Sequence, residues 1–190
     1  MTKPMLAHKF DDSRVDWSKP VYIQPKLDGV RCIIKRVSDF PGQEYLASYS
    51  VKAYSRTGKE FKNVRHITNA LKGFFLHNPD TVLDGELYNH KLRNDFEKII
   101  SLVRKQKPTD TDRRDAQHLV QFHCYDYVDG KYESYKARMN NLVCSNIYDA
   151  QIKYVHADKV HSYEAARDFH AAYLSAVSYT HLRAHETRTY

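Results

Sequence analysis

A short segment near the N-terminus combines a lysine, a carboxylate, a glycine and an arginine. Lys26, Asp28, Gly29 and Arg31 form the pattern K-x-D-G-x-R. A lysine amine becomes a nucleophile when it loses its proton, and neighbouring cations or a metal ion favour that loss. At the ordinary lysine pKa of about 10.4, roughly one amine in a thousand is neutral near pH 7.4, a deficit of about 4 kcal/mol. The four residues are of the types that such chemistry needs, and the motifs around them decide whether Lys26 has this role.

Three further groups of polar residues follow at predicted strand ends or turns. They are SRTG at 55–58, which contains Arg56, DGEL at 84–87, which contains Glu86, and YDYV at 125–128, which begins with Tyr125. Strand ends and turns can present such side chains to one cleft. Asp28, Asp84 and Glu86 add carboxylate groups to this set.

These motifs, in this order, resemble those of the covalent nucleotidyltransferases, and specifically the small ATP-dependent DNA ligases of viruses and bacteriophages. The PMLA at 4–7 is also similar to these ligases, and the resemblance runs from about Pro4 to Ala176. It implies that Lys26 attacks the α-phosphate of ATP, with Mg²⁺ as cofactor, and forms a lysine-AMP intermediate. The AMP would then pass to the 5′-phosphate of a nick in duplex DNA, which the adjoining 3′-hydroxyl would seal.

The resemblance also assigns roles to particular side chains. Arg31 and Arg56 would bind the nucleotide and the 5′-phosphate of the nick, because a guanidinium fork suits phosphate. Glu86 would contact the ribose or the metal ion, for which Asp28 is a second candidate ligand. Tyr125 takes the place where the family has an aromatic residue, usually phenylalanine, stacked on adenine.

Gln24, two residues before the nucleophile, would read the edge of the base. The complete nucleotide-binding set is Gln24, Lys26, Arg31, Arg56, Glu86 and Tyr125.

The likeness weakens toward the C-terminus. The Glu-Gly and K-x-K motifs of the family do not follow Glu86 and Lys107, and no oligonucleotide-binding (OB) domain follows either. We expect a ligase-like adenylation domain over 1–176, incomplete at its C-terminus and weakened in transition-state stabilisation by the loss of these motifs. Residues 177–190 resemble translated sequencing-adapter sequence, and we expect this tail to be unrelated to the family.

Composition limits the class of protein. The 190 residues are 42% hydrophobic and carry a formal charge of +7, which indicates a globular chain with a polyanionic partner. Cys32, Cys124 and Cys144 form no C-x-x-C pair, which argues against a zinc knuckle or a disulfide framework and favours a reducing compartment. The sequence offers no apolar run of about 18 residues for a membrane span. We therefore expect a monomer in the cytoplasm.

Hydrophobic periodicity predicts the elements that carry these motifs. Alternation predicts two strands at 21–37 around the Asp28–Gly29 turn, and further strands within 44–58, 81–88, 119–128 and 153–160. Helical spacing predicts helices within 67–75, 92–103, 136–150 and 163–174, whereas 105–116 is expected to be an exposed loop. This mixture favours an α+β fold with mainly antiparallel sheets flanked by helices and a nucleotide cleft between them.

Two other functions stay open at this stage. An RNA ligase or a GTP-using capping enzyme shares the lysine chemistry, and base choice would separate it from a DNA ligase. A non-catalytic nucleic-acid-binding module would keep the motifs as relics and take up no covalent nucleotide.

Overall fold

The computed structural model describes residues 15–42, 48–93, 95–129, 134–145, 147, 149–176 and 182–185. Its strands are β1 (Val21–Pro25), β2 (Val30–Ser38), β3 (Tyr49–Tyr54), β4 (Val82–Tyr88), β5 (Gln121–Val128), β6 (Ile152–Tyr154), β7 (Asp158–Val160) and β8 (Leu182–His185). Its helices are α1 (Arg65–Ala70), α2 (Lys72–His77), α3 (Phe96–Val103), α4 (Asp110–Leu119), α5 (Tyr135–Cys144) and α6 (Tyr163–Ala176), with a 3₁₀ helix, η3, at His90–Leu92.

Five of the strands form one twisted sheet in the order β3-β2-β4-β5-β6. The pairs are antiparallel except β5 with β6, which is parallel. Successive side chains of a strand point to opposite faces. On β2 this alternation sends Cys32 and Ile34 into the core, both fully buried, and leaves Arg31 and Lys35 on the other face. The sheet therefore has one core face and one polar face.

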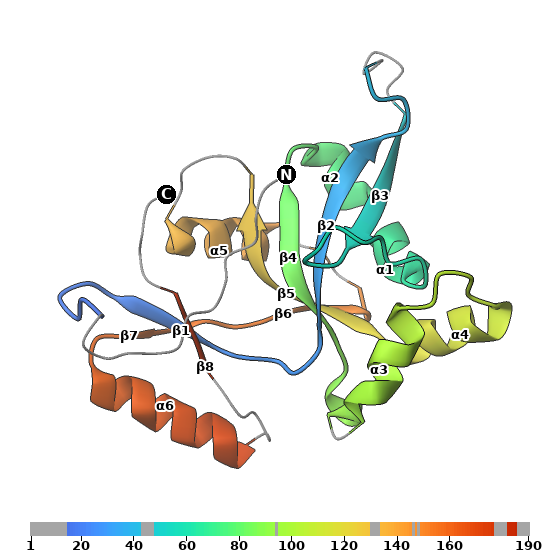
Figure 1. Cartoon of the computed structure of the whole chain (residues 1–190). Helices are drawn as coiled ribbons and strands as arrows, with labels where there is room; N and C mark the ends of the chain where they lie inside the picture. Colours follow the sequence, from blue (N-terminus) through green and yellow to red (C-terminus); the bar gives the residue numbers. More distant parts are fainter. Residues whose placement is uncertain are drawn as a thin grey trace.

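The core face is covered by helices (Figure 1). Ile67 of α1, Phe75 of α2 and Ile99 of α3 are fully buried and belong to one cluster with Leu83 and Leu87 of β4. Each such side chain contributes about 1.5–3 kcal/mol when it leaves water. This packing fixes the sheet and leaves its polar face free to carry the candidate site.

A second, three-stranded antiparallel sheet has the order β7-β1-β8. Val21 and Ile23 of β1 pack with Val160 of β7 and Ala166 of α6, which lies along this sheet in Figure 1. Leu27, just after β1, packs instead with Tyr88 of β4, so the segment between β1 and β2 joins the two sheets. The lysine motif therefore lies where the sheets meet.

The expected α+β fold with mainly antiparallel sheets is confirmed. The expected strands and helices appear, except that the single strand predicted at 153–160 is wrong: β6 and β7 belong to different sheets.

The loop predicted at 105–116 is also wrong, because α4 begins at Asp110. Thr109 and Asp112 form a reciprocal capping box, which satisfies backbone N–H groups at the start of that helix. The charged composition of the segment concealed this helix start.

The tail predicted to be unrelated to the family contains β8, whose four residues pair with Tyr22–Pro25 of β1. The domain boundary at 176 stays a prediction, and the other residues of 177–190 lie outside the described residues, as does the PMLA at 4–7. None of the described helices has the length and apolar run that a membrane span requires, and the described strands form the two sheets above.

Candidate active site

Lys26 lies in the turn between β1 and β2, where the chain leaves one sheet for the other. Its Nζ lies 3.3 Å from the Oδ1 of Asp28, and the two side chains are 39% and 49% exposed. An ion pair this exposed contributes little to stability, about 0–1 kcal/mol. The carboxylate is nevertheless a partner for the protonated amine, so a nucleophilic Lys26 requires Asp28 to turn away or to be neutralised.

Gly29 lets this turn lie directly against β4. A Cβ atom at this position would be 2.5 Å from the carbonyl oxygen of Leu87 and 2.6 Å from the Cγ of Glu86. Real Cβ atoms do not approach this closely, and the oxygen cannot move away without the strand. The glycine in the K-x-D-G-x-R pattern is therefore required by close approach, which holds the lysine turn beside Glu86.

Arg31 and Glu86 are direct partners in the antiparallel ladder between β2 and β4, so both side chains lie on the polar face. The Arg31 Nε donates to the Oδ1 of Asp84 at 3.0 Å, and an Nη donates to the other carboxylate oxygen. Burial alone would lower the pKa of the Arg31 guanidinium. The hydrogen bonds and charge of Asp84, together with Tyr125 and Glu86, outweigh burial and raise this pKa above its ordinary value. The fork of Arg31 is thus occupied, and a phosphate would have to replace Asp84.

Glu86 is only 6% exposed although it carries a carboxyl group. Buried acidic residues are rare in proteins unless they have partners, and Glu86 does make a polar interaction in this structure. Its position beside Gly29 and opposite Arg31 places it next to the lysine turn. Contact of Glu86 with a nucleotide or a metal ion stays a prediction.

Tyr125 of β5 lies under the guanidinium of Arg31, and the Cζ of Arg31 is 5.7 Å from the centroid of the Tyr125 ring. It is 3% exposed and packs with Leu27, Tyr88 and Val155. The ring is thus an aromatic surface at the junction of the two sheets. Stacking of adenine on this ring stays a prediction.

Gln24 is 1% exposed, and its Nε2 donates to the carbonyl oxygens of Val155 at 3.0 Å and Tyr125 at 3.5 Å. These bonds tie the end of β1 to β5 and so position Tyr125. Contact of Gln24 with a base edge stays a prediction, and the amide nitrogen is already used by the main chain.

Arg56 is the one predicted site residue that the described structure does not bring against the others. It is exposed in the turn after β3, where the backbone N–H of Lys59 donates to Ser55 Oγ at 3.0 Å and Gly58 adopts a φ of 85°. Its guanidinium makes no ion pair with any described carboxylate. Arg56 is therefore available to a ligand, and its role stays a prediction.

Sequence reasoning missed Tyr88 and Val155, which complete the apolar floor beside Tyr125. The alternation of β4 could have revealed Tyr88, since Asp84, Glu86 and Tyr88 share one face of the strand. Val155 follows β6 and could not be placed without the parallel pairing of β6 with β5.

A metal ion would find few ligands in the chain itself. The part of the chain that the structure describes has no group of three or more His, Cys, Asp or Glu residues arranged to hold one. Mg²⁺ is commonly held by one or two carboxylates together with substrate phosphates. The half-exposed carboxylate of Asp28 fits that arrangement, whereas Asp84 is already paired with Arg31.

The family model described as "ATP dependent DNA ligase domain" matches residues 4–178. A search of curated protein sequences finds no match.

Solved structures with the same fold include a Lig E DNA ligase, with a TM-score of 0.65, 18% identity and 100% of this chain covered. The bacteriophage T7 ATP-dependent DNA ligase in complex with ATP gives a TM-score of 0.52 and 15% identity over 79% of this chain. An archaeal ATP-dependent RNA ligase gives a TM-score of 0.58 and 15% identity over 90% of this chain.

At these identities the likeness shows the fold. The chain spans 64%, 52% and 40% of the lengths of these three structures, respectively, and 38% of a fourth, named Pmar-Lig_Pre.

The family match covers most of the chain, including the lysine turn, the five-stranded sheet and the helices that flank it. The chain therefore belongs to the ATP-dependent DNA ligase family, of which it forms the adenylation domain.

Proposed function

We propose that this chain activates itself as a lysine-AMP intermediate through Lys26. The observation that supports this proposal most is the placement of the Lys26 turn against β4 by Gly29, with Glu86 and Arg31 opposite each other beside it. The neutral amine would attack the α-phosphorus of ATP, forming a P–N bond. The bond from the α-phosphorus to the bridging oxygen would break, and pyrophosphate would leave with that oxygen.

The AMP would then move to the 5′-phosphate at a nick in duplex DNA, restoring the lysine amine. The 3′-hydroxyl on the other side of the nick would attack that phosphate, form the phosphodiester and release AMP. Nick sealing of this kind serves DNA repair, replication and recombination.

Asp28 would have two tasks in this scheme. While it is paired with Lys26 it stabilises the ammonium form, which cannot attack. Bound Mg²⁺ would neutralise phosphate and pyrophosphate charge, and Asp28, with Glu86 nearby, would hold it. Engagement of Asp28 by a cation would separate it from the amine of Lys26.

Arg31 and Arg56 would both bind phosphate groups, but only Arg31 is paired with a carboxylate before the phosphate arrives. Arg31 is held by Asp84 and would exchange that carboxylate for a phosphate, whereas Arg56 is exposed and free of described ion pairs. Tyr125 would supply the ring for adenine and Gln24 would hold Tyr125 in place. A monomer in the cytoplasm is part of this proposal, and the free cysteines at 32, 124 and 144 favour the reducing compartment.

Intact-mass measurement after incubation with ATP and Mg²⁺ tests this proposal. We expect the mass to rise by one AMP on the wild-type chain and not on Lys26→Ala. Replacing ATP with GTP distinguishes a capping-type enzyme, and a nicked RNA substrate distinguishes an RNA ligase, whose fold is also similar.

A further inference from the structure

A polar pocket of about 290 Å³ opens between α1 and α4, away from the lysine turn. It is lined by Asn63, Arg65, His66, Asn69, Arg113 and Gln117. None of these six residues carries a negative charge, and two of them carry a positive charge. A pocket of this composition favours an anion.

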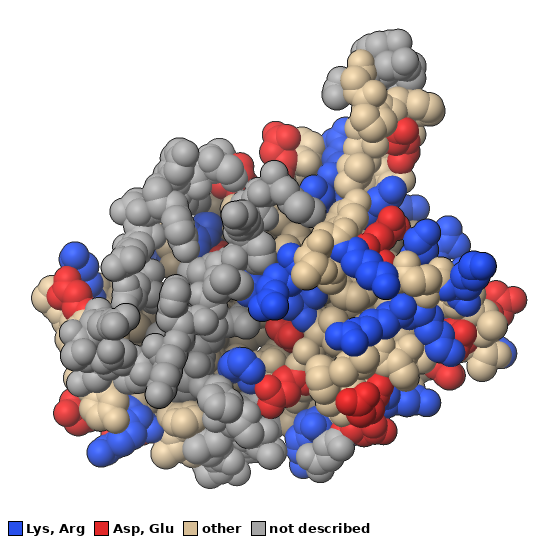
Figure 2. Space-filling model, viewed as in Figure 1, with Lys and Arg blue, Asp and Glu red and all other residues tan. Residues whose placement is uncertain are grey.

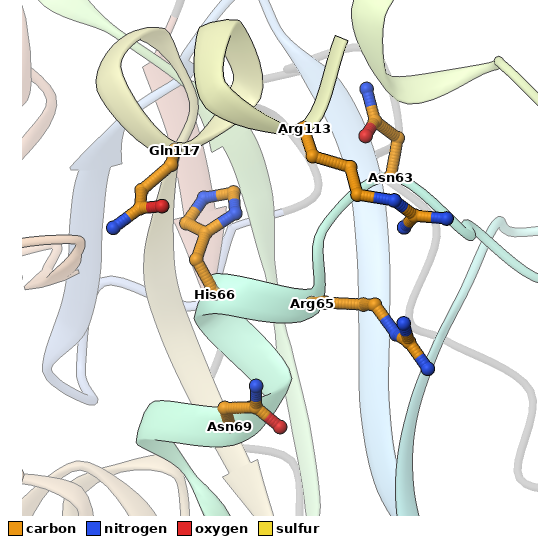
Figure 3. Close-up of a pocket in the computed structure, with 6 residues that line it drawn as sticks. All are labelled: Asn63, Arg65, His66, Asn69, Arg113 and Gln117. Atoms are coloured by element: carbon orange, nitrogen blue, oxygen red, sulfur yellow. The ribbon is translucent and has the colours of Figure 1, made fainter. Parts of the chain in front are cut away.

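The pocket is built by two helical faces that oppose each other. Arg65 and Asn69 are four residues apart on α1, as are Arg113 and Gln117 on α4, so each pair lies on one side of its helix. Figure 3 shows the guanidinium groups of Arg65 and Arg113 extending from α1 and α4 toward the same side of the pocket. An anion on that side of the pocket would be attracted by both positive charges.

Buried hydrogen bonds hold the walls in place. The Nδ2 of Asn63, which is 2% exposed, donates to the carbonyl oxygens of Leu102 at 3.0 Å and Asp112 at 3.1 Å. The Nε2 of His66 lies 3.0 Å from the carbonyl oxygen of Val120 and donates to it. Burial lowers the pKa of the His66 ring overall, although the bond to Val120 and the charge of Asp149 oppose that shift. The pocket is thus formed before any ligand binds.

Buried and half-buried arginines elsewhere in the described structure have partners, whereas Arg65 is exposed and Arg113 is half-buried. Arg31 is paired with Asp84 and Arg138 with Asp126. Arg65 and Arg113 have no such carboxylate among the described residues, so their guanidinium groups are available to a ligand.

The surroundings of the pocket point to a polymer. Arg56, Lys59, Lys62 and Arg65 recur at every third residue, and all four are exposed. Figure 2 shows Lys and Arg side chains gathered over the region of α1, β2 and β3. The chain turns between Ser55 and Lys59, so the ten residues from Arg56 to Arg65 span less than the roughly 30 Å of an extended segment, a distance along which a nucleic-acid strand still presents more than one phosphate. A free phosphate ion would use the pocket alone.

We propose that the pocket between α1 and α4 binds a backbone phosphate of the polynucleotide, held by Arg65 and Arg113. This inference rests on the proposed ligase function, to which it adds a substrate contact outside the lysine turn. The exposed basic residues Lys59 and Lys62 lie in the chain between Arg65 of the pocket and Arg56, which is proposed to bind the 5′-phosphate.

Salt-dependent binding of a nicked duplex oligonucleotide, measured by fluorescence anisotropy, tests this contact. The logarithm of the association constant falls linearly with the logarithm of the salt concentration, and removal of one phosphate contact makes this negative slope shallower by about 0.9. We expect Arg113→Gln and Arg65→Gln each to make the slope shallower by that amount and to weaken binding about tenfold. Arg114→Gln is the matched control, because Arg114 lies on α4 but outside the pocket and contacts Thr111. Equal losses in the control and the pocket variants would overturn the proposal, as would wild-type binding by both pocket variants.

The ring signals of His66 in NMR spectra report on the pocket in the wild-type chain. We expect the oligonucleotide to shift them, and inorganic phosphate to compete with that shift at high concentration. A shift with inorganic phosphate and none with the oligonucleotide would overturn the proposal in favour of a free anion. Lysine adenylation, measured on the same variants, should be unchanged, so a failure of adenylation in the wild-type chain is recognised separately from a failure of this pocket.

Discussion

Replacement of Gly29 by alanine tests whether the lysine turn depends on its contact with β4. The new Cβ would start 2.5 Å from the Leu87 carbonyl oxygen, whereas ordinary contacts begin at 3.4 Å. The backbone must therefore separate by almost 1 Å, because neither the oxygen nor the main chain of the turn can rotate away. Overpacking of this kind costs about 1–3 kcal/mol.

The loss of backbone freedom in the unfolded alanine chain offsets part of this cost, by about 0.4–1 kcal/mol. Each kcal/mol corresponds to about 2–4 °C in the melting temperature of a chain this long, so we expect Gly29→Ala to melt a few degrees below wild type. The effect on adenylation should be larger, since a 1 Å displacement of a reacting group can cost about a hundredfold in rate.

Gly73→Ala provides the matched control. Gly73 lies exposed in α2, and a Cβ there would meet nothing within 4 Å. Alanine is better than glycine in a helix by up to about 1 kcal/mol, so this variant should be as stable as wild type or more so and should adenylate normally. Thermal unfolding and timed intact-mass measurements give both quantities. A Gly29→Ala chain that melts and adenylates like wild type would refute the placement of the turn.

Three further perturbations test the surroundings of the site. Asp84→Asn leaves the Arg31 guanidinium without its carboxylate at a position where the Arg31 and Asp84 side chains are 15% and 8% exposed. We expect the free energy of unfolding, measured in urea, to fall by about 3–5 kcal/mol. An unchanged urea midpoint would contradict the pairing. Burial lowers the pKa of His123 from 6.5 to about 4, and the positive charges of Lys153 and His90 add to this effect. The neutral ring therefore contributes up to about 3 kcal/mol to the free energy of unfolding above pH 6.5, and this contribution is lost as the pH falls toward 4. Unfolding midpoints at pH 7 and pH 4.5 should differ less in His123→Gln than in wild type, and equal differences would contradict the burial of this ring. Thr109→Ala removes the side-chain acceptor of the capping box at α4 and should cost about 1 kcal/mol, whereas Thr109→Ser should keep the stability; a Ser variant as weak as the Ala variant would argue against the cap.

Local sequence signals were sufficient for most of the elements. The alternation around Cys32 and Ile34 predicts β2, and the helical spacing of Ile67, Leu71 and Phe75 predicts the helical segment that packs on it. The structure divides that segment into α1 and α2 at Leu71, which caps both helices. Periodicity located the apolar residues, but the division depends on how the helices fit the sheet.

Long-range pairing was not accessible in the same way. Nothing in residues 152–160 indicates that β6 pairs with β5 while β7 pairs with β1. The strand β8 could not be predicted for the same reason. It has only four residues, and its pairing with β1, far away in the sequence, is what defines it as a strand.

For the candidate site, the motif pattern predicted one region for Lys26, Arg31, Glu86 and Tyr125. The structure brings Arg31 against Glu86 and Tyr125 beside the turn that carries Lys26, and the roles of these residues stay predictions. It could not show that Arg31 is occupied by Asp84 or that Gln24 donates to main-chain carbonyls. Those contacts depend on register between strands far apart in the sequence. The pocket between α1 and α4 was also hidden, because the segment that forms α4 was expected to be a loop.

The most direct measurement of the central claim is the site of covalent AMP on the chain. The purified protein is incubated with ATP and Mg²⁺, digested, and mapped by tandem mass spectrometry, with Lys26→Ala and Lys26→Arg treated in parallel. We predict one AMP on the peptide that contains Lys26 and none on either variant. AMP on a different residue, or its persistence in the Lys26 variants, would contradict the account, as would a wild-type chain that takes up no AMP.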